Sequence, residues 1–165
     1  MEEYKSNDKK ITVIVDYAHN RLSFEKLFDS VFQEHSGEKI VTVFGCPGQK
    51  AYNRRRELGM IAGLFSHTVY LTADDPGTEP LEKIFDDIRP HVETTGCACI
   101  CVKDRKEAVF QAVRGIKGKT VLLVLGKGNE GHQKIGTEIV PYPTDSELVC
   151  MALEEYNRTH SIKKK

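Results

Sequence analysis

The sequence has no excess of charge of either sign, because 24 Lys and Arg residues balance 24 Asp and Glu residues among its 165. A neutral balance gives no support to the binding of nucleic acid or another polyanion. No apolar run approaches the roughly 20 residues that a membrane helix needs. Residues 1–5 are polar and charged, unlike a secretory signal. We therefore expect a cytoplasmic protein that binds neither nucleic acid nor a membrane, and the basic cluster 163–165 indicates a frayed tail.

Spacings typical of metal sites and phosphate loops are also absent from the sequence. Cys97, Cys99 and Cys101 alternate, whereas zinc-binding cysteines come in closely spaced pairs. On a strand these side chains would share one face, and we expect them to be small apolar residues of a buried strand. The histidines show no metal-ligand spacing, and no Gly-x-x-x-x-Gly-Lys-[Ser/Thr] loop occurs. The sequence thus predicts no metal ligand and no catalytic residue in this chain.

The chain instead alternates apolar runs with amphipathic stretches. Buried strands are predicted at 11–15, 40–44, 68–71, 97–102 and 120–125, with a short strand around Ile139. Helices are predicted at 22–32, 54–65, 80–92, 104–113 and 146–156. This order predicts one doubly wound α/β domain over 11–157, with a mostly parallel sheet covered by helices on both faces. We expect 1–10 to be the remnant of a linker and 158–165 to be a tail.

Four polar or glycine-rich motifs follow predicted strands, at 16–20, 45–50, 74–77 and 126–130. In open α/β sheets ligands bind outside the carboxyl ends of the strands, so we expect all four motifs to meet at one edge. Each motif also has a structural interpretation. Residues 16–20 could end a strand and cap a helix, and 45–48 could be an ordinary turn or a nest of N–H groups for an anion. Residues 74–77 could be a plain turn, although adjacent carboxylates there suit a cationic substrate group.

Taken in order, the four motifs resemble those of the C-terminal domain of Mur ligases, and most closely those of the UDP-N-acetylmuramyl-tripeptide synthetases. Asp-Tyr-Ala-His-Asn at 16–20 resembles an Asp-Tyr-Ala-His-[Asn/Thr]-Pro segment that cyanophycin synthetases share. Phe-Gly-Cys-Pro-Gly at 44–48 resembles a Phe-Gly-Cys-Gly-Gly turn. Asp-Asp-Pro-Gly at 74–77 and Gly-Lys-Gly-Asn-Glu at 126–130 resemble Asp-Asn-Pro-Arg and Gly-Lys-Gly-His-Glu segments. The order and spacing match over about 11–156, which makes the resemblance specific.

The resemblance implies a Rossmann-like domain of an ATP-dependent amide ligase of cell-wall synthesis. In this family ATP phosphorylates a carboxylate of a UDP-muramyl peptide, and the amine of an incoming amino acid attacks the acyl phosphate. An N-terminal domain holds the UDP end, and a central domain carries the phosphate loop and the magnesium ligands. The C-terminal domain closes over the site, contacts the nucleotide and selects the amino acid. ATP and Mg²⁺ would therefore be bound mainly by a central domain outside this chain, and the chain alone would be inactive.

The resemblance also implies roles for nine residues. Asp16, His19 and Asn20 match positions that face the nucleotide. The positions on the amino-acid side are Lys50, Asp74, Asp75, Gly77, Gly126 and Glu130.

Departures from the family pattern refine the prediction of the substrate. Gly77 replaces the Arg that holds the distal carboxylate of diaminopimelate, and it follows the two acidic residues Asp74 and Asp75. Because a distal carboxylate needs a fixed cation, we expect a cationic side chain without that carboxylate, with L-lysine first. Lys50 is the alternative, as a cation that could reach the carboxylate instead.

Other departures leave alternatives open. Arg21 stands where the family has Pro, Gln49 and Lys50 replace an acidic–basic pair, and Asn129 replaces His. The chain could therefore belong to a cyanophycin-synthetase-like or other divergent ligase, or be a stand-alone binding domain, because fold alone does not separate these functions. The reading frame upstream of Met1 would distinguish them.

Overall fold

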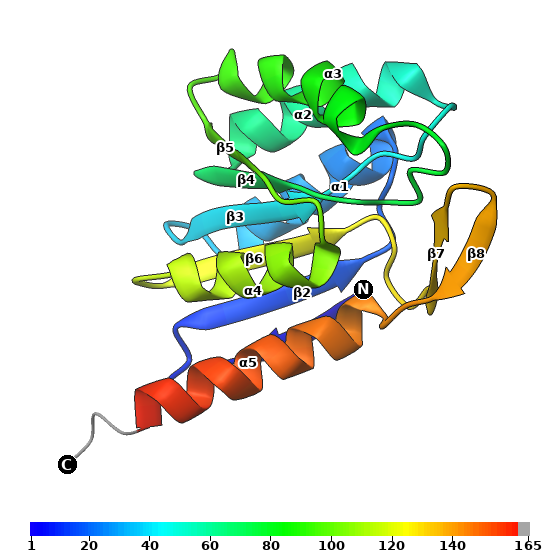
Figure 1. Cartoon of the computed structure of the whole chain (residues 1–165). Coiled ribbons are helices and arrows are strands. Elements are labelled where there is room, and N and C mark those ends of the chain that lie inside the picture. The colour runs from blue at the N-terminus through cyan, green and yellow to red at the C-terminus, as the bar shows by residue number, and fades with distance from the viewer. Residues whose placement is uncertain (162–165) are drawn as a thin grey trace.

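The computed structural model describes residues 1–161, and in it a six-stranded sheet lies between two layers of helices (Figure 1). The basic cluster 163–165 lies outside the described residues. The strand order is β1-β2-β6-β3-β4-β5, and every neighbouring pair is parallel except β1 and β2. The bounds of these strands are β1 Glu2–Lys5, β2 Ile11–Asp16, β3 Lys39–Phe44, β4 Thr68–Leu71, β5 Ala98–Cys101 and β6 Thr120–Leu125.

Helices cover both faces of the sheet. One face carries α1 (Arg21–Glu34), α2 (Tyr52–Phe65) and α3 (Leu81–Glu93), and the other carries α4 (Arg105–Gly115) and α5 (Asp145–Ser161) (Figure 1). Successive side chains of a strand point to opposite faces, so β6 contributes Leu123 and Leu125 to the first core, and Leu122 and Val124 to the second. Because β6 is buried at all six positions and apolar from Val121 to Leu125, it can lie at the centre of a two-sided sheet. The predicted doubly wound fold is confirmed.

Local signals explain where the helices begin. The Asn20 side chain accepts a hydrogen bond from Ser23 N, and the Ser23 hydroxyl lies within bonding distance of the Asn20 backbone, which forms a capping box for α1. The Asp104 side chain accepts from Glu107 N and caps α4. The predicted proline at the start of α3 is Pro80, which lies at the N-cap, one residue before the helix.

Several polar strands and ends differ from the sequence-based expectation. The segment 1–10, expected to be a linker remnant, contains β1, whose alternating exposure fits an edge strand. A hairpin of β7 (His132–Ile135) and β8 (Glu138–Pro141) replaces the single short strand expected around Ile139. Residues 158–161, expected to be part of a tail, continue α5. Short polar strands carry little apolar periodicity, which is why the sequence did not reveal them.

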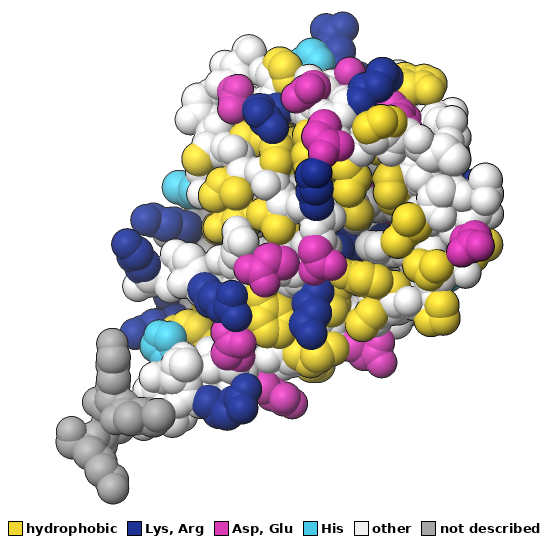
Figure 2. All heavy atoms as spheres, in the orientation of Figure 1, with side chains coloured by type: hydrophobic (Ala, Val, Ile, Leu, Met, Phe, Trp, Pro, Cys, Tyr) yellow, Lys and Arg dark blue, Asp and Glu magenta, His cyan; other side chains and the backbone are white. Residues whose placement is uncertain are grey.

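The surface agrees with the neutral composition. On the face that carries α4 and α5, basic and acidic side chains are interspersed and do not form a patch of one sign (Figure 2). Among the residues that the structure describes, no helix combines the length and apolar character needed to cross a membrane.

Candidate functional site

The four motifs meet at one edge of the sheet, as predicted. They follow β2, β3, β4 and β6, which are parallel neighbours in the order β2-β6-β3-β4. Their carboxyl ends therefore open onto a common surface (Figure 1).

A cleft of ≈ 180 Å³ lies at this edge and gathers residues from all four motifs. Five of the six residues expected on the amino-acid side line it, and the sixth, Gly77, does not. His19, expected near the nucleotide, lines the same cleft. The full set of lining residues is Tyr17, His19, Pro47, Lys50, Arg54, Asp74, Asp75, Gly126 and Glu130.

The adjacent carboxylates Asp74 and Asp75 have different environments. Asp74 is only 7% exposed, and burial raises its pKa to about 6, although Arg105 and Lys127 act in the opposite direction. Burial also acts to raise the pKa of Asp75, but hydrogen bonds from the Lys127 ammonium and from Lys134 N lower it overall. Asp75 has a φ of 47°, in the left-handed region that is uncommon for residues other than glycine. Only Asp75 is thus paired directly with a cation.

Lys127 lies under the cleft and joins two of its carboxylates. Its side chain is 2% exposed, and Nζ lies 2.7 Å from Asp75 Oδ1 and 3.0 Å from Glu130 Oε2. Burial acts to lower the pKa of Lys127, but the bonds to Asp75 and Glu130 raise it, so the side chain stays charged. The sequence prediction did not include Lys127, because Gly-Lys-Gly only loosely resembles a phosphate loop and Asp75 is 52 residues away.

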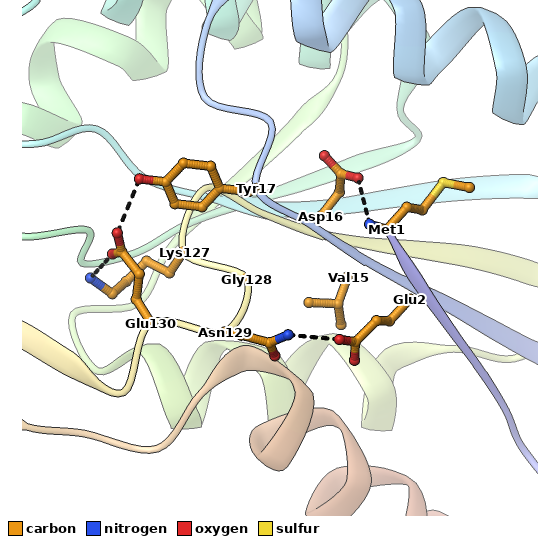
Figure 3. A pocket seen from close by; sticks show the side chains of 9 residues that line it. All are labelled: Met1, Glu2, Val15, Asp16, Tyr17, Lys127, Gly128, Asn129 and Glu130. Carbon is orange, nitrogen blue, oxygen red and sulfur yellow. Dashed lines mark hydrogen bonds and ion pairs between the residues drawn. The ribbon is translucent and has the colours of Figure 1, made fainter.

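A second cleft, of ≈ 400 Å³, lies beside the first and is shown in Figure 3. Asp16 lines it together with Tyr17 and Glu130, which also line the first cleft. The Tyr17 hydroxyl donates to Glu130 Oε1 at 3.0 Å, and both residues of this bond line both clefts. The Asp16 Oδ1 atom accepts from Ala18 N at 2.8 Å, while its Oδ2 atom lies 3.4 Å from the Met1 amino group.

The three residues expected at the nucleotide are therefore not gathered in one place. Asp16 and His19 line different clefts, although Tyr17, between them in sequence, borders both. Asn20 lines neither of these clefts and caps α1, the structural role that the sequence left open. The His19 Nδ1 atom lies 2.7 Å from Tyr17 O, which holds the imidazole against the Tyr17 ring.

The Gly45–Gly48 turn is packed against the Asp74–Gly77 turn. A β-carbon on Gly48 would lie 1.8 Å from Pro76 O, and Gly48 N donates to Asp75 O at 3.1 Å. This N–H group is therefore engaged within the protein, which favours the turn over the anion-binding nest. Cys46 is buried, and burial raises its pKa to about 12, so its thiol is unreactive.

A buried ion pair links these two turns. Arg55 binds Glu79 through its two terminal nitrogens, Nη1 and Nη2, at 2.8 and 2.7 Å, and Nη2 donates to Pro47 O at 3.2 Å. The Glu79 carboxylate also accepts from Gln49 N, and hydrogen bonding by Arg55 is the main reason that its pKa falls to about 2. The pair therefore holds the segment that follows β3 against the segment that follows β4.

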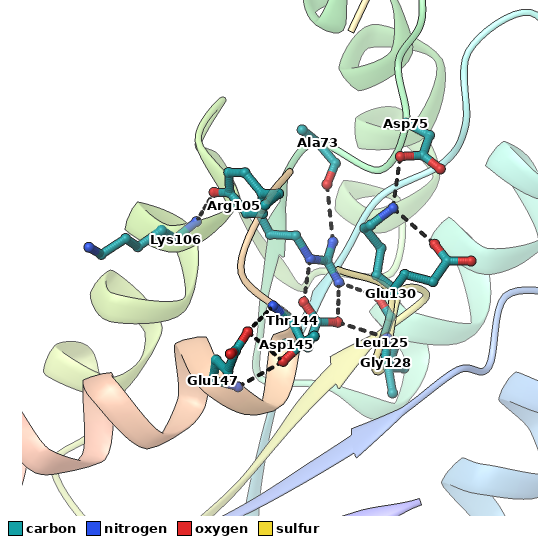
Figure 4. Close-up of polar contacts among 12 residues, drawn as sticks. Ala73, Asp75, Arg105, Lys106, Leu125, Gly128, Glu130, Thr144, Asp145 and Glu147 are labelled. Atoms are coloured by element: carbon teal, nitrogen blue, oxygen red, sulfur yellow. Dashed lines mark hydrogen bonds and ion pairs between the residues drawn. The ribbon is translucent and has the colours of Figure 1, made fainter. Parts of the chain in front are cut away.

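A second buried ion pair, between Arg105 and Asp145, contacts the backbone just before two of the cleft residues, and Figure 4 shows these contacts. Arg105 Nε and Nη2 bind the two Asp145 oxygens at 2.7 and 2.8 Å. The same guanidinium donates to Ala73 O and Leu125 O, the residues just before Asp74 and Gly126, and Asp145 Oδ2 accepts from Gly128 N. No local sequence pattern marks this pair, because the partners are 40 residues apart.

Gly77 is held by the β7–β8 hairpin and not by the cleft. Its N–H donates to Lys134 O at 3.0 Å, and its carbonyl accepts from Gly136 N at 2.7 Å. Its φ of 59° lies in the left-handed region that favours glycine.

Three possible metal ligands come together near the cleft. Ligand atoms of Asp75, Glu130 and His132 lie within 4.8 Å of one another. However, the Lys127 ammonium already binds both carboxylates, which fills the place of a cation between them. The described residues therefore do not form a set suited to Mg²⁺ while Lys127 is in place.

Comparison with known proteins identifies the class to which this fold and site belong. The family model for the Mur ligase, glutamate ligase domain matches residues 1–128, and the chain belongs to this family. Within it, the chain is 33% identical over 143 residues to a UDP-N-acetylmuramyl-tripeptide synthetase of Lactobacillus acidophilus, covering 87% of this chain and 27% of that protein. It is 37% identical over 137 residues to a UDP-N-acetylmuramoyl-L-alanyl-D-glutamate–2,6-diaminopimelate ligase of Helicobacter hepaticus, covering 83% and 28%. It is thus a Mur ligase C-terminal domain.

Solved structures agree. A UDP-N-acetylmuramoyl-L-alanyl-D-glutamate–2,6-diaminopimelate ligase superposes with a TM-score of 0.82 at 25% identity, over 93% of this chain and 31% of that one. E. coli FolC in complex with ADP shares the fold, with a TM-score of 0.56 at 15% identity over 96% of this chain and 31% of that one. The chain spans less than a third of the length of the curated relatives given above.

Proposed function

We propose that this chain serves as the C-terminal domain of an ATP-dependent ligase that adds an amino acid to UDP-N-acetylmuramyl dipeptide. The observation that carries the proposal is the cleft in which Lys50, Asp74, Asp75, Gly126 and Glu130 come together from three strand ends. Carboxylates and a lysine around one small cleft suit a zwitterionic amino acid, which brings both an ammonium and a carboxylate. Because the reaction consumes ATP and a UDP-linked precursor, we place it in the cytoplasm.

The proposal assigns the chemistry of phosphoryl transfer to the rest of the ligase. ATP and Mg²⁺ would be held mainly by a central domain, because this chain has no phosphate loop and Lys127 occupies its cluster of acidic ligands. The chain incubated with ATP, an amino acid and UDP-muramyl dipeptide should release no phosphate above background. The full-length ligase is the control, and turnover by the chain alone at about 1 s⁻¹ or more would contradict the proposal.

We assign the second cleft to the nucleotide. Asp16 lines this cleft and could accept hydrogen bonds from a ribose hydroxyl. His19 lines the neighbouring cleft, close to the Tyr17–Glu130 bond, where it would face the phosphates at the border of the two sites. Asn20 would support this segment through its cap of α1 and would not touch the nucleotide itself.

The amino acid added should be L-lysine and not diaminopimelate. Asp74 lines the cleft and accepts no hydrogen bond from the described residues, so its carboxylate is available to a substrate ammonium. The position of the family's carboxylate-binding Arg is Gly77, which has no side chain to reach the distal carboxylate. A carboxylate brought next to Asp74 without such a cation would be repelled and poorly solvated.

The test is the ratio of kcat/KM for lysine and diaminopimelate in the full-length ligase that carries this domain. We expect lysine to be favoured by roughly tenfold or more, since a charged hydrogen bond contributes about 1.5–3 kcal/mol. Gly77→Arg should move the ratio toward diaminopimelate. A clear preference of the unmodified enzyme for diaminopimelate would refute this assignment, and loss of that preference in Lys50→Met would identify Lys50 as the selecting residue.

A further inference from the structure

Two cysteines on the edge strand β5 form a pair outside both clefts. Cys99 and Cys101 are two residues apart, so their side chains point to the same face of the sheet, toward the core under α3. Both are half-buried, because β5 is the last strand of the sheet and only one of its edges is paired. The expectation of a fully buried cysteine strand therefore holds only for Cys97, just before the strand.

A cation from α3 contacts the outer member of the pair. Arg89 Nη2 lies 3.0 Å from Cys101 Sγ, and Arg89 Nε is buried without a hydrogen-bond partner among residues 1–161. A guanidinium with unused donor capacity beside a sulfur atom favours the thiolate over the thiol. None of the other cysteines of the chain has an Arg hydrogen bond of this kind in the described structure.

The surrounding charges agree with this geometry. The neighbouring Cys99 thiol is the largest influence on the pKa of Cys101, and together with Arg89 it outweighs burial and lowers that pKa. The same interaction raises the pKa of Cys99, which therefore stays a thiol. Asp86 and Glu93, also from α3, face the pair and act against the thiolate, but they do not reverse the effect of Arg89 and Cys99.

We propose that Cys101 is a modification site, where a thiolate paired with the Arg89 guanidinium attacks low-molecular-weight disulfides. The Cys101 sulfur forms a bond to one sulfur of the disulfide RS–SR, the S–S bond breaks, and RS⁻ leaves with the electron pair. The product is a mixed disulfide on Cys101, and no further oxidant is needed. This inference does not depend on the proposed ligase function.

The test measures the reaction of the whole chain with 2,2′-dithiodipyridine from about pH 5 to pH 9, with peptide mapping to locate the label. An ordinary thiol with a pKa near 8.5 is only about 1% thiolate at pH 6.5. At that pH we expect Cys101 to react roughly tenfold or more faster than the exposed Cys150, which serves as the internal control. Labelling of Cys150 before Cys101 at every pH would overturn the proposal.

Variants test the part played by the cation. Arg89→Gln should slow labelling of Cys101 at pH 6.5 by roughly tenfold and move its pH profile upward, whereas Arg89→Lys should retain most of the rate. Arg114→Gln is the matched control, because Arg114 pairs with Glu155 on the far face of the sheet. Circular dichroism verifies that each variant is folded. An unchanged Cys101 rate in folded Arg89→Gln would refute the assignment, and the pH profile of the unmodified chain tests it independently.

Discussion

Two buried cations lie at the same edge of the sheet, yet their surroundings differ. Arg105 is fully enclosed, and all its bonds go to Asp145 and to the backbone carbonyls of Ala73 and Leu125. Lys127 is equally buried, but its partners Asp75 and Glu130 are partly exposed and line the cleft. The comparison indicates that Arg105 fixes the framework, whereas Lys127 sets the charge of surfaces that a ligand can reach.

Removal of each cation in turn should have the largest effects on stability. Arg105→Ala leaves Asp145 buried and unpaired, so the free energy of unfolding should fall by about 3–5 kcal/mol. Lys127→Met should cost less, about 1–2 kcal/mol, because water can solvate the carboxylates that it leaves behind. Urea unfolding of the chain at neutral pH measures both.

The matched control for the larger effect is the double change Arg105→Met with Asp145→Leu. It removes both charges at once, so it should recover part of the lost stability. If Arg105→Ala lowered the free energy of unfolding less than Lys127→Met, the assignment of Arg105 to the framework and of Lys127 to the cleft would be wrong.

Asp74 responds to both cations, because Arg105 and Lys127 each act to lower its pKa. Its pKa is raised by burial from 3.8 to about 6 in the folded chain, so the folded state binds the proton more tightly. As the pH rises from about 4 to about 6, the unfolded chain ionises first, and the stability due to this group is lost. Between about pH 4 and pH 7, the unmodified chain should lose on the order of 2–3 kcal/mol relative to Asp74→Asn.

Parallel urea midpoints of the two proteins at both pH values test this directly. A constant difference between them would mean that Asp74 ionises normally when folded, and that its carboxylate is better solvated or better paired than its burial indicates.

Substitution of Gly126 should have a smaller effect on stability than loss of Arg105, and it tests how closely the backbone of Gly126 packs against Asp74. Its φ is 110°, and a β-carbon there would lie 2.8 Å from Asp74 Oδ2. Gly126→Ala should therefore destabilise the chain by about 1–3 kcal/mol. Gly118→Ala is the control, because a β-carbon there meets nothing within 4 Å, and it should be neutral or stabilise by about 0.4–1 kcal/mol. If the two substitutions had equal effects on thermal unfolding, Gly126 would not pack closely against the Asp74 carboxylate.

The sequence predicted the parts of this arrangement that depend on local patterns. Apolar strands such as 120–125 and caps such as Asp104 are visible within a few residues, and the parallel order of the strands then brings the four motifs to one edge. The polar β1 strand and the β7 strand of the hairpin have no such pattern, and the sequence did not reveal them.

Within the site, the sequence could not predict roles that depend on contacts between residues far apart in the chain. The sequence treated Asp74 and Asp75 as one acidic pair, but a left-handed backbone at Asp75 gives them different partners. It also omitted Lys127, Arg105 and Asp145, whose roles come from contacts between distant parts of the chain. Gly77 was expected in the cleft because of its motif, but the hairpin holds it outside.

We propose that the two clefts, which share Tyr17 and Glu130 in their linings, serve different substrates. The most direct measurement compares the KM values for ATP and for the amino acid in the full-length ligase carrying Asp16→Ala or Lys50→Met. We predict that Asp16→Ala raises KM for ATP more than KM for the amino acid, and that Lys50→Met does the reverse. The opposite ranking in either variant would contradict the assignment of the clefts.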